Sequence, residues 1–369
     1  MANSSYQIAT TPKLYVSYPL FQYASGALDT YGTDRNSFSE EELIKLIQLD
    51  PSNYSNWLTG VNGWDKLTYR IVPSNDDNSP VDSGLWNFDF FMMLGHNIAS
   101  LYGGKNFALN AVQDYVPNYT TTIVGELEYS SIVNCPYQST PEYDGWSLAQ
   151  INDIPSDANG LQIHFQSLIS NTNWNDFNLG ALAWGKSYTF PMNTQINTST
   201  KFEYGLSQKS TISGKTISTA NYTKPNNWIT EPFGLSESST AGIYARNEKG
   251  DNFQRRSGRR VWKMTFDSLA PDKVMPQNMM MNSNGFTAQD NHSVAADDVS
   301  SLYNINNSED FYSAVVHKTM SGHLPMVLQI DSSDNSPSNF AIVRMNKDYT
   351  VTQKSPLLFS YSITLTEQI

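Results

Sequence analysis

The chain has 369 residues and a net charge of −12, with 16% charged and 12% aromatic residues. Its length allows two domains, or three small ones, with well-buried cores. The acidic balance argues against a nucleic-acid-binding surface or an anionic-membrane patch, and no run of the sequence approaches a membrane span. Low charge together with many aromatic side chains is typical of β-rich proteins with large, wet contact surfaces.

Two further features concern the cellular setting. The single cysteine, Cys135, excludes an internal disulfide, and we interpret it as a small buried side chain. Residues 1–5 lack the charged and apolar regions of a signal peptide. We therefore expect a product that is made and folded in a cytoplasm.

Residues 1–82 predict an N-terminal segment that packs on the body of the protein. Residues 13–20 are expected to form a strand that Pro19 breaks. Ser39 and Glu42 have the spacing of a capping box, and apolar residues recur after them at helical intervals. The loop-rich stretch that follows predicts a domain boundary or an exposed hairpin tip.

Residues 83–220 predict an antiparallel β-sandwich. Short apolar runs separated by turn residues have the spacing of sandwich strands. They lie at 86–94, 121–124, 160–165 and 182–190. A hairpin of residues 201–209 and 215–219 is expected to return from this sandwich. Residues 221–254 are rich in turn-forming residues and predict a linker or a long surface excursion.

Residues 255–369 predict a compact α+β unit. After a basic run, the first strand places Trp262, Met264 and Phe266 on one face at period two. A helix is expected at residues 308–320 because acidic residues come early in it and apolar residues recur at helical spacing. The predicted order of strand, helix and further strands is that of an α+β unit.

The predicted helix has two candidate caps and one apolar face. Ser308 or Asn307 can accept hydrogen bonds from its free N–H groups. Its buried face is expected to consist of Phe311, Val315 and Thr319. Three strands then complete the unit, at 325–330, 340–345 and 357–366.

This unit resembles a group of tailed-bacteriophage virion proteins. The resemblance lies in the run GRRVW at residues 258–262, in HKTMSGHLP at residues 317–325 and in the terminal alternating strand. The arrangement also resembles the tube-type domain of distal tail and baseplate proteins, in which a sheet flanked by one helix assembles into a ring. Residues 94–99 and 182–186 resemble the galactose-binding-like jelly roll inserted in several phage virion proteins.

The resemblance implies a non-enzymatic structural component of the virion, placed at the tail tip, baseplate or neck. It implies a ring of identical subunits, with the β-sandwich offered to tail-tube, neck or fibre proteins. The residues themselves indicate no cofactor or metal site. The implied assembly face and its supporting sheet residues are Arg255, Arg256, Arg259, Arg260, Trp262, Phe359 and Tyr361. From the residues alone the basic run has two interpretations, a patch that meets an acidic neighbour or arginines that simply face solvent.

Other functions have weaker support in the sequence. Trp146, Trp174 and Trp184 can form a sugar-stacking platform, which would make the protein a carbohydrate- or receptor-binding module, or they can fill the sandwich core. A glycosidase needs two carboxylates at a set separation, which the sequence cannot establish. The acids available for such a pair are Glu126, Glu128, Glu142 and Asp144.

Two motifs that could indicate a metal site or a phosphate-binding loop are better explained in other ways. His317 and His323 flank the end of the predicted helix, but their spacing does not place them on one helical face as a metal pair, and the helix dipole accounts for a histidine there. Residues 213–216, SGKT, resemble the end of a phosphate-binding loop. The glycine that such a loop needs earlier is replaced by Lys209, and a hairpin is predicted instead.

Overall fold

The computed structural model gives a protein made mainly of antiparallel sheets, and the mainly β prediction is confirmed. The structure describes residues 11–24, 28–31, 40–50, 55–56, 64–71, 88–96, 105–115, 120–126, 129–133, 145–151, 160–167, 178–191, 199–203, 206–220, 259–276, 305, 308–335, 339–346 and 349–368. Within these residues the helices are short, so the architecture depends on how the sheets stack.

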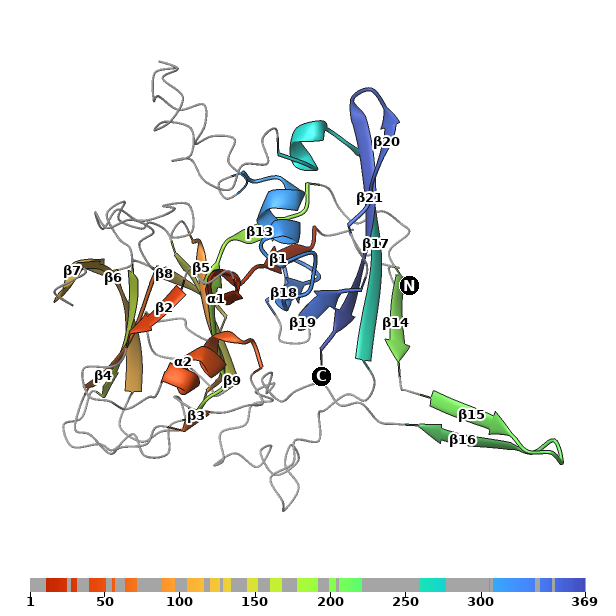
Figure 1. The fold of residues 1–369 in the computed structure, drawn as a ribbon, viewed down its shortest axis with the longest axis horizontal. Helices are drawn as coiled ribbons and strands as arrows, with labels where there is room; N and C mark the ends of the chain where they lie inside the picture. Colours follow the sequence, from red (N-terminus) through yellow and green to blue (C-terminus); the bar gives the residue numbers. More distant parts are fainter. Residues whose placement is uncertain are drawn as a thin grey trace, which may run out of the picture.

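The largest of these sheets, called here the C-terminal sheet, contains eight strands (Figure 1). Seven of them follow one another in space, and the eighth, β20 (Val351–Ser355), pairs with β21 beside this path. The order in space is β13 (Ser187–Thr189), β1 (Lys13–Tyr15), β18 (Met326–Gln329), β19 (Phe340–Met345), β21 (Leu358–Glu367), β17 (Arg259–Leu269) and β14 (Ser199–Glu203).

Three strands of this sheet come from before residue 255. β1 pairs with β18 and β13 pairs with β1, while β14 pairs with β17 at the other side of the sheet. The predicted unit of residues 255–369 is therefore not self-contained, and the sheet does not follow the predicted boundary. The reason is that β1 and β13 are only three residues long, too short for their alternation to indicate a distant partner.

Two further sheets form the other half of the molecule. The central sheet has the order β12 (Ala181–Gly185), β5 (Phe90–His96), β9 (Gly145–Ile151) and β8 (Tyr129–Val133). The outer sheet has the order β2 (Leu28–Tyr31), β4 (Trp64–Ile71), β10 (Gly160–Ser167), β6 (Lys105–Tyr115) and β7 (Thr120–Glu126). The short pair β3 (Ser55–Asn56) and β11 (Asn178–Leu179) accompanies them. The predicted N-terminal segment thus supplies β2 and β4 to the outer sheet.

The central sheet is buried between the other two sheets. All seven residues of β5 are buried, and successive side chains point to opposite neighbours. Phe91 contacts Phe107 of the outer sheet, with ring centroids 5.9 Å apart. Phe90 contacts Tyr15 of the C-terminal sheet at 5.1 Å. A strand with two buried faces loses the alternation of polar and apolar residues, as the run FDFFMML shows.

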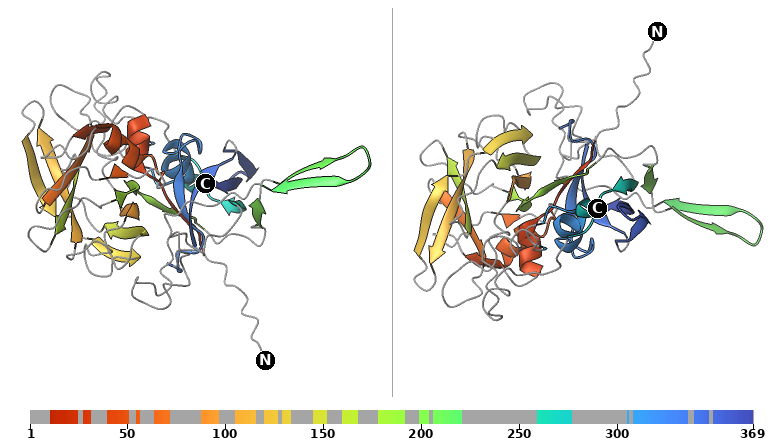
Figure 2. Two further views of the ribbon diagram at one scale, coloured as in Figure 1. Left: turned by 90° about the horizontal axis from the view of Figure 1, so that it is seen from below. Right: turned by 90° about the horizontal axis from the view of Figure 1, so that it is seen from above.

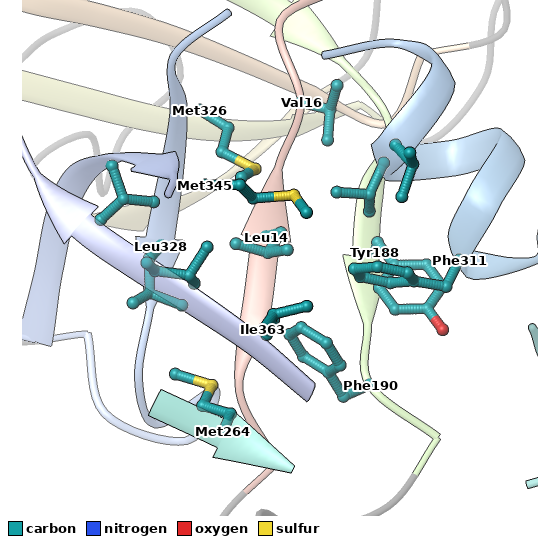
Figure 3. Close-up of a cluster of buried hydrophobic side chains, with 14 of the residues drawn as sticks. Leu14, Val16, Tyr188, Phe190, Met264, Phe311, Met326, Leu328, Met345 and Ile363 are labelled. Carbon is teal, nitrogen blue, oxygen red and sulfur yellow. The ribbon is translucent and has the colours of Figure 1, made fainter. Parts of the chain in front are cut away.

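The second face of the C-terminal sheet carries the main hydrophobic core (Figure 3). The π-helix η4 (Tyr312–His317) covers this face, and Phe311 at its start stacks on Tyr361 with centroids 4.6 Å apart. Phe190 and Phe266 stack in parallel at 4.4 Å. The predicted burial of Phe311, Val315 and Thr319 is confirmed. Aromatic pairs of this kind fix the position of the helix on the sheet.

The start of η4 differs from the prediction. The carboxylate of Asp310, not Ser308, accepts the hydrogen bond from the backbone N–H of Ser313 at 3.0 Å, and Asn307, the other candidate, lies outside the described residues. The hydroxyl of Ser308 instead donates to the carboxylate of Asp310. Ser308 therefore orients the residue that caps the helix.

Two of the predicted strands are each divided into two elements in the structure. Residues 13–20 hold β1 and then helix α1 (Tyr18–Ala24), since Pro19 fits the first turn of a helix, where its missing N–H is not needed. Residues 182–190 divide at Lys186 into β12 of the central sheet and β13 of the C-terminal sheet. A Cβ on Gly185 would lie 2.1 Å from the carbonyl oxygen of Val16, so this crossing needs a glycine.

The second α-helix agrees with the sequence pattern. Helix α2 (Glu40–Ile47) buries Leu43, Leu46 and Ile47, as its helical spacing predicts. The predicted capping box involves Ser39, which lies outside the described residues. The last predicted strand begins one residue late, because Leu357 is an exposed turn residue between β20 and β21.

Candidate assembly surface

A projecting hairpin is the most prominent surface feature of the described chain. β15 (Leu206–Ser210) and β16 (Thr216–Ala220) pair only three residues after β14, and they extend away from the body in all three views (Figures 1 and 2). We call residues 206–220 the arm. The sequence predicted a hairpin here, but as a return from the sandwich, not as a projection.

The tip of the arm is a turn built by its own sequence. The Thr211 N–H donates to the carbonyl of Lys215 at 2.8 Å, and the Lys215 N–H donates to the Thr211 hydroxyl oxygen at 3.1 Å. Gly214 adopts φ +80°, a left-handed conformation that suits glycine. The SGKT run is therefore a hairpin turn, as predicted.

The arm has no core of its own. Side chains from Ser207 to Ser210 and from Ile212 to Ser218 are exposed, and those of Ile212 and Ile217 are the apolar ones. Its charged residues are Lys209 and Lys215, with no acidic residue among residues 206–220, in a chain whose net charge is −12. The arm is thus a positively charged, partly apolar strand pair carried by an acidic protein.

The strand that leads into the arm, β14, ends the order of the C-terminal sheet. Its first four side chains are exposed, and Phe202 keeps 51% of its surface accessible. A strand at the end of a sheet presents backbone groups that can pair with another strand. The edge strand β14 and the arm follow each other closely in the chain, and each offers exposed side chains and strand edges suited to contact with another chain.

The arginines of the basic run do not form a free positive patch. Arg259 is half-exposed and donates to Glu203 of β14 at 2.8 Å. This hydrogen bond, with a second one from Lys201, lowers the pKa of the Glu203 carboxyl below its ordinary value. Arg255 and Arg256 lie outside the described residues. The assignment of this run to an assembly face is therefore not supported at Arg259, whose charge Glu203 already balances.

Arg260 belongs to the interior, and its assignment to the assembly face is wrong. Its guanidinium donates to both carboxylate oxygens of Glu367, at 3.1 and 3.3 Å, and to the carbonyl of Phe340 at 2.8 Å. The guanidinium also lies 4.7 Å from the ring of Trp262. Arg260 thus joins β17 to the last residue of β21 and to β19.

The aromatic residues assigned to the same face also lie inside. Trp262 and Tyr361 are buried at 1% and 2% exposure, so neither can contact another subunit without unfolding of the sheet. Tyr361 does support the sheet, since it stacks in the main core. Phe359 is half-buried and lines a surface pocket of about 370 Å³ with Val274 and Met275.

The proposed sugar platform is not present in the described structure. Trp146 and Trp184 are fully buried in the central sheet, and Trp146 packs against Phe340 with centroids 4.5 Å apart. Their assignment to glycan contact is corrected, because sugar stacking requires an open ring face. Trp174 lies outside the described residues.

The residues considered for a glycosidase pair cannot be placed. Glu128, Glu142 and Asp144 lie outside the described residues, as does the side chain of Glu126.

His317 packs edge-on against Phe21 at 5.1 Å, and burial lowers the pKa of its imidazole to about 4. His323 is exposed. His317 is therefore best explained as a neutral packing residue of η4.

Comparison with known protein families, with curated proteins and with solved structures gives no match. Among the helices in the described ranges, none has the length and apolar character needed to cross a membrane. Inference about function therefore rests on the geometry of this chain and on the sequence resemblance already described.

Proposed function

We propose that the protein is a non-enzymatic structural subunit of a tailed-phage virion, at the tail tip, baseplate or neck. Identical copies assemble into a ring, and other virion proteins attach to the two-sheet half of the molecule. In this proposal the outer and central sheets form the galactose-binding-like jelly roll, and the C-terminal sheet with η4 forms the α+β tube-like unit. The sequence resemblance at residues 258–262 and 317–325 supports this identity.

The observation that carries the proposal is the arm. A two-stranded hairpin with no buried side-chain face is at best marginally stable in water. Such a hairpin becomes stable when its strands and apolar side chains lie on a partner. Ile212 and Ile217 supply the apolar surface for that contact.

The charge of the arm favours a second copy of this chain as the partner. Lys209 and Lys215 are unopposed by any acid in the arm, whereas the chain as a whole is strongly acidic. Electrostatic complementarity of this kind steers association and fixes its register. A contact between the arm of one copy and a different surface of the next is heterologous, and heterologous contacts close into rings when the rotation allows it.

The test is the native mass of the full-length protein by light scattering, with negative-stain imaging of the same sample. We expect a discrete closed oligomer. Lys209→Glu together with Ile217→Asp should reduce the mass toward that of a monomer, because both the charge and the apolar contact are lost. Lys354→Glu is the matched control, since Lys354 is an exposed lysine on β20 of the C-terminal sheet, not in the arm, and its reversal should leave the oligomer intact.

Two results would contradict the proposal. One is a monomer at every accessible concentration, with no rings in the images. The other is an oligomer that keeps its mass after the arm has been altered, which would place the interface elsewhere.

A further inference from the structure

A second surface feature lies where the loop after η4 meets the end of β19. An open pocket of about 560 Å³ is lined there by Ser321, Gly322 and His323 from the loop. Arg344 and Asn346 line it from the end of β19. No acidic residue lines it within the part of the chain that the structure describes.

Arg344 differs from the two other arginines of the C-terminal sheet. Arg259 and Arg260 each have a glutamate partner. Arg344 is half-buried, and among the described residues its Nε has no hydrogen-bond partner and its guanidinium has no carboxylate within ion-pair distance. A buried donor on a cationic group is costly when it is left unpaired. A group of this kind is satisfied by a water molecule or by a ligand from outside the chain.

The loop that lines this pocket together with Arg344 is held in an unusual backbone conformation. Met320 and Ser321 have φ of +51° and +59°, and Gly322 follows with φ +82°. Left-handed conformations of residues other than glycine persist only where their surroundings enforce them, and they concentrate at ligand clamps and active sites. The loop is therefore preorganised, not merely a surface connection.

Several hydrogen bonds fix this loop in place. The Ser321 N–H donates to the carbonyl of Val316 at 2.7 Å, and the Gly322 N–H donates to the Thr319 hydroxyl oxygen at 3.0 Å. Gly322 also packs so closely on β19 that an added Cβ would lie 2.2 Å from the Cβ of Met345. Ser321 and His323, on either side of Gly322, are thereby held at a fixed place in the wall of the pocket that Arg344 also lines.

We propose that this pocket binds a small oxyanion, either a phosphate or a carboxylate, with Arg344 as its principal ligand. The planar guanidinium offers paired N–H donors that match both groups. The hydroxyl of Ser321 and the amide of Asn346 supply further donors from the two sides of the pocket. The site does not depend on the arm or on assembly, and it is a binding site separate from the proposed function.

The experiment is calorimetric titration of the full-length protein at low ionic strength with inorganic phosphate and, separately, with acetate. Arg344→Gln should weaken binding at least about tenfold, because it removes both the positive charge and the paired N–H donors of the guanidinium. Arg344→Lys keeps the charge alone and should fall between the wild type and Arg344→Gln. Lys263→Gln removes an equal charge from an exposed position on β17 and should bind like the wild type.

The two titrants separate the two sources of the oxyanion. Tighter binding of phosphate indicates a free phosphate or a phosphate ester, and equal or tighter binding of acetate indicates a carboxylate. Loss of either one with Arg344→Gln supports the site, provided that the variant's thermal midpoint shows that it is folded. The proposal is wrong if neither anion binds the wild type at 10 mM or below (~10 mM marks the weak end of ligand binding), or if binding persists in the folded Arg344→Gln variant.

Discussion

The C-terminal sheet and the arm are both made of antiparallel strands, yet they are stabilised in opposite ways. In the sheet, strands β1, β18 and β19 bury side chains on both faces, against the central sheet on one side and the main core on the other. None of the described side chains of the arm is buried, and its two strands pair with each other. Both regions therefore have paired strands, and they differ in the burial of their side chains.

This difference separates residues that determine folding from residues that are available for contact. A side chain in the sheet that is removed leaves a cavity or an unpaired group, so its loss is felt by the whole molecule. Removal of an exposed side chain from the arm creates neither a cavity nor an unpaired group in the isolated protein. The comparison therefore predicts large effects on stability in the sheet, and effects confined to association in the arm.

The largest effect is expected at the buried ion pair of Arg260 and Glu367. Arg260→Met should lower the free energy of unfolding by about 3–5 kcal/mol, because the buried Glu367 carboxylate loses the guanidinium that balances its charge and keeps only the neutral hydrogen bond from the backbone N–H of residue 260. Arg259→Met, at a part-exposed pair, should cost no more than about 1 kcal/mol. Chemical denaturation midpoints of the two variants measure the contrast.

A double variant shows whether the loss arises from the uncompensated charge. Arg260→Met with Glu367→Leu should recover most of the loss, since a hydrophobic pair can replace a buried ion pair at little cost. Equal destabilisation by the Arg259 and Arg260 variants would mean that the interior pair has no special role.

Two glycines with the same backbone conformation sharpen the comparison. Gly322 in the sheet region has φ +82° and Gly214 in the arm has φ +80°. A Cβ on Gly322 meets Met345, whereas a Cβ on Gly214 meets no atom within 4 Å. Gly322→Ala should cost about 2–4 kcal/mol, from backbone strain and overpacking together.

Gly214→Ala carries the same backbone strain but acts only on the arm. We expect the global unfolding midpoint to stay unchanged, because the arm's folding is not coupled to the core. A shift of the midpoint as large as that of Gly322→Ala would show that the arm is part of the cooperative unit.

A pH dependence is expected from His96 in the central sheet. Burial lowers the pKa of its imidazole to about 3, and the ring is hydrogen-bonded to the Ser147 hydroxyl at 2.8 Å. Between pH 6.5 and pH 3 the unfolded chain takes up a proton that the folded protein does not. Stability therefore falls as the pH falls through this range, and His96 alone should contribute a loss of about 2 kcal/mol by pH 5.

The measurement compares the wild type with His96→Gln, in denaturation experiments at pH 7 and pH 5. The variant should lose less stability than the wild type over this interval, because glutamine does not titrate there. Equal losses would show that His96 is not buried as a neutral imidazole.

The sequence could predict elements whose pattern is set locally. The strand with Trp262, Met264 and Phe266 and the helix face of Phe311 and Val315 follow from period-two and helical spacing, because large apolar side chains with one buried face leave little freedom. These predictions concern which face is buried. They do not identify what covers that face.

What the sequence could not predict depends on residues far apart in the chain. Arg260 reads as a surface charge until Glu367, 107 residues later, is placed beside it. Trp146 and Trp184 were open to interpretation as ligand-binding or, more readily, as core residues, because only the stacking of the central sheet on its neighbours decides their exposure. The arm was visible as a hairpin, but the absence of a covering layer is a tertiary property that strand propensity does not encode.

The smallest effect on stability is expected in the arm itself. Ile217→Thr should change the free energy of unfolding of the monomer by less than about 0.5 kcal/mol, because an exposed side chain leaves no cavity.

Arm amides should also exchange with solvent much faster than those of β17 in dilute protein, since a lone hairpin opens readily. If the arm contacts a second copy, its amides gain protection with rising protein concentration, and Ile217→Thr reduces that gain. Exchange measured at two concentrations tests both statements, and strong arm protection at the lower concentration would mean that the arm is already held by its own chain.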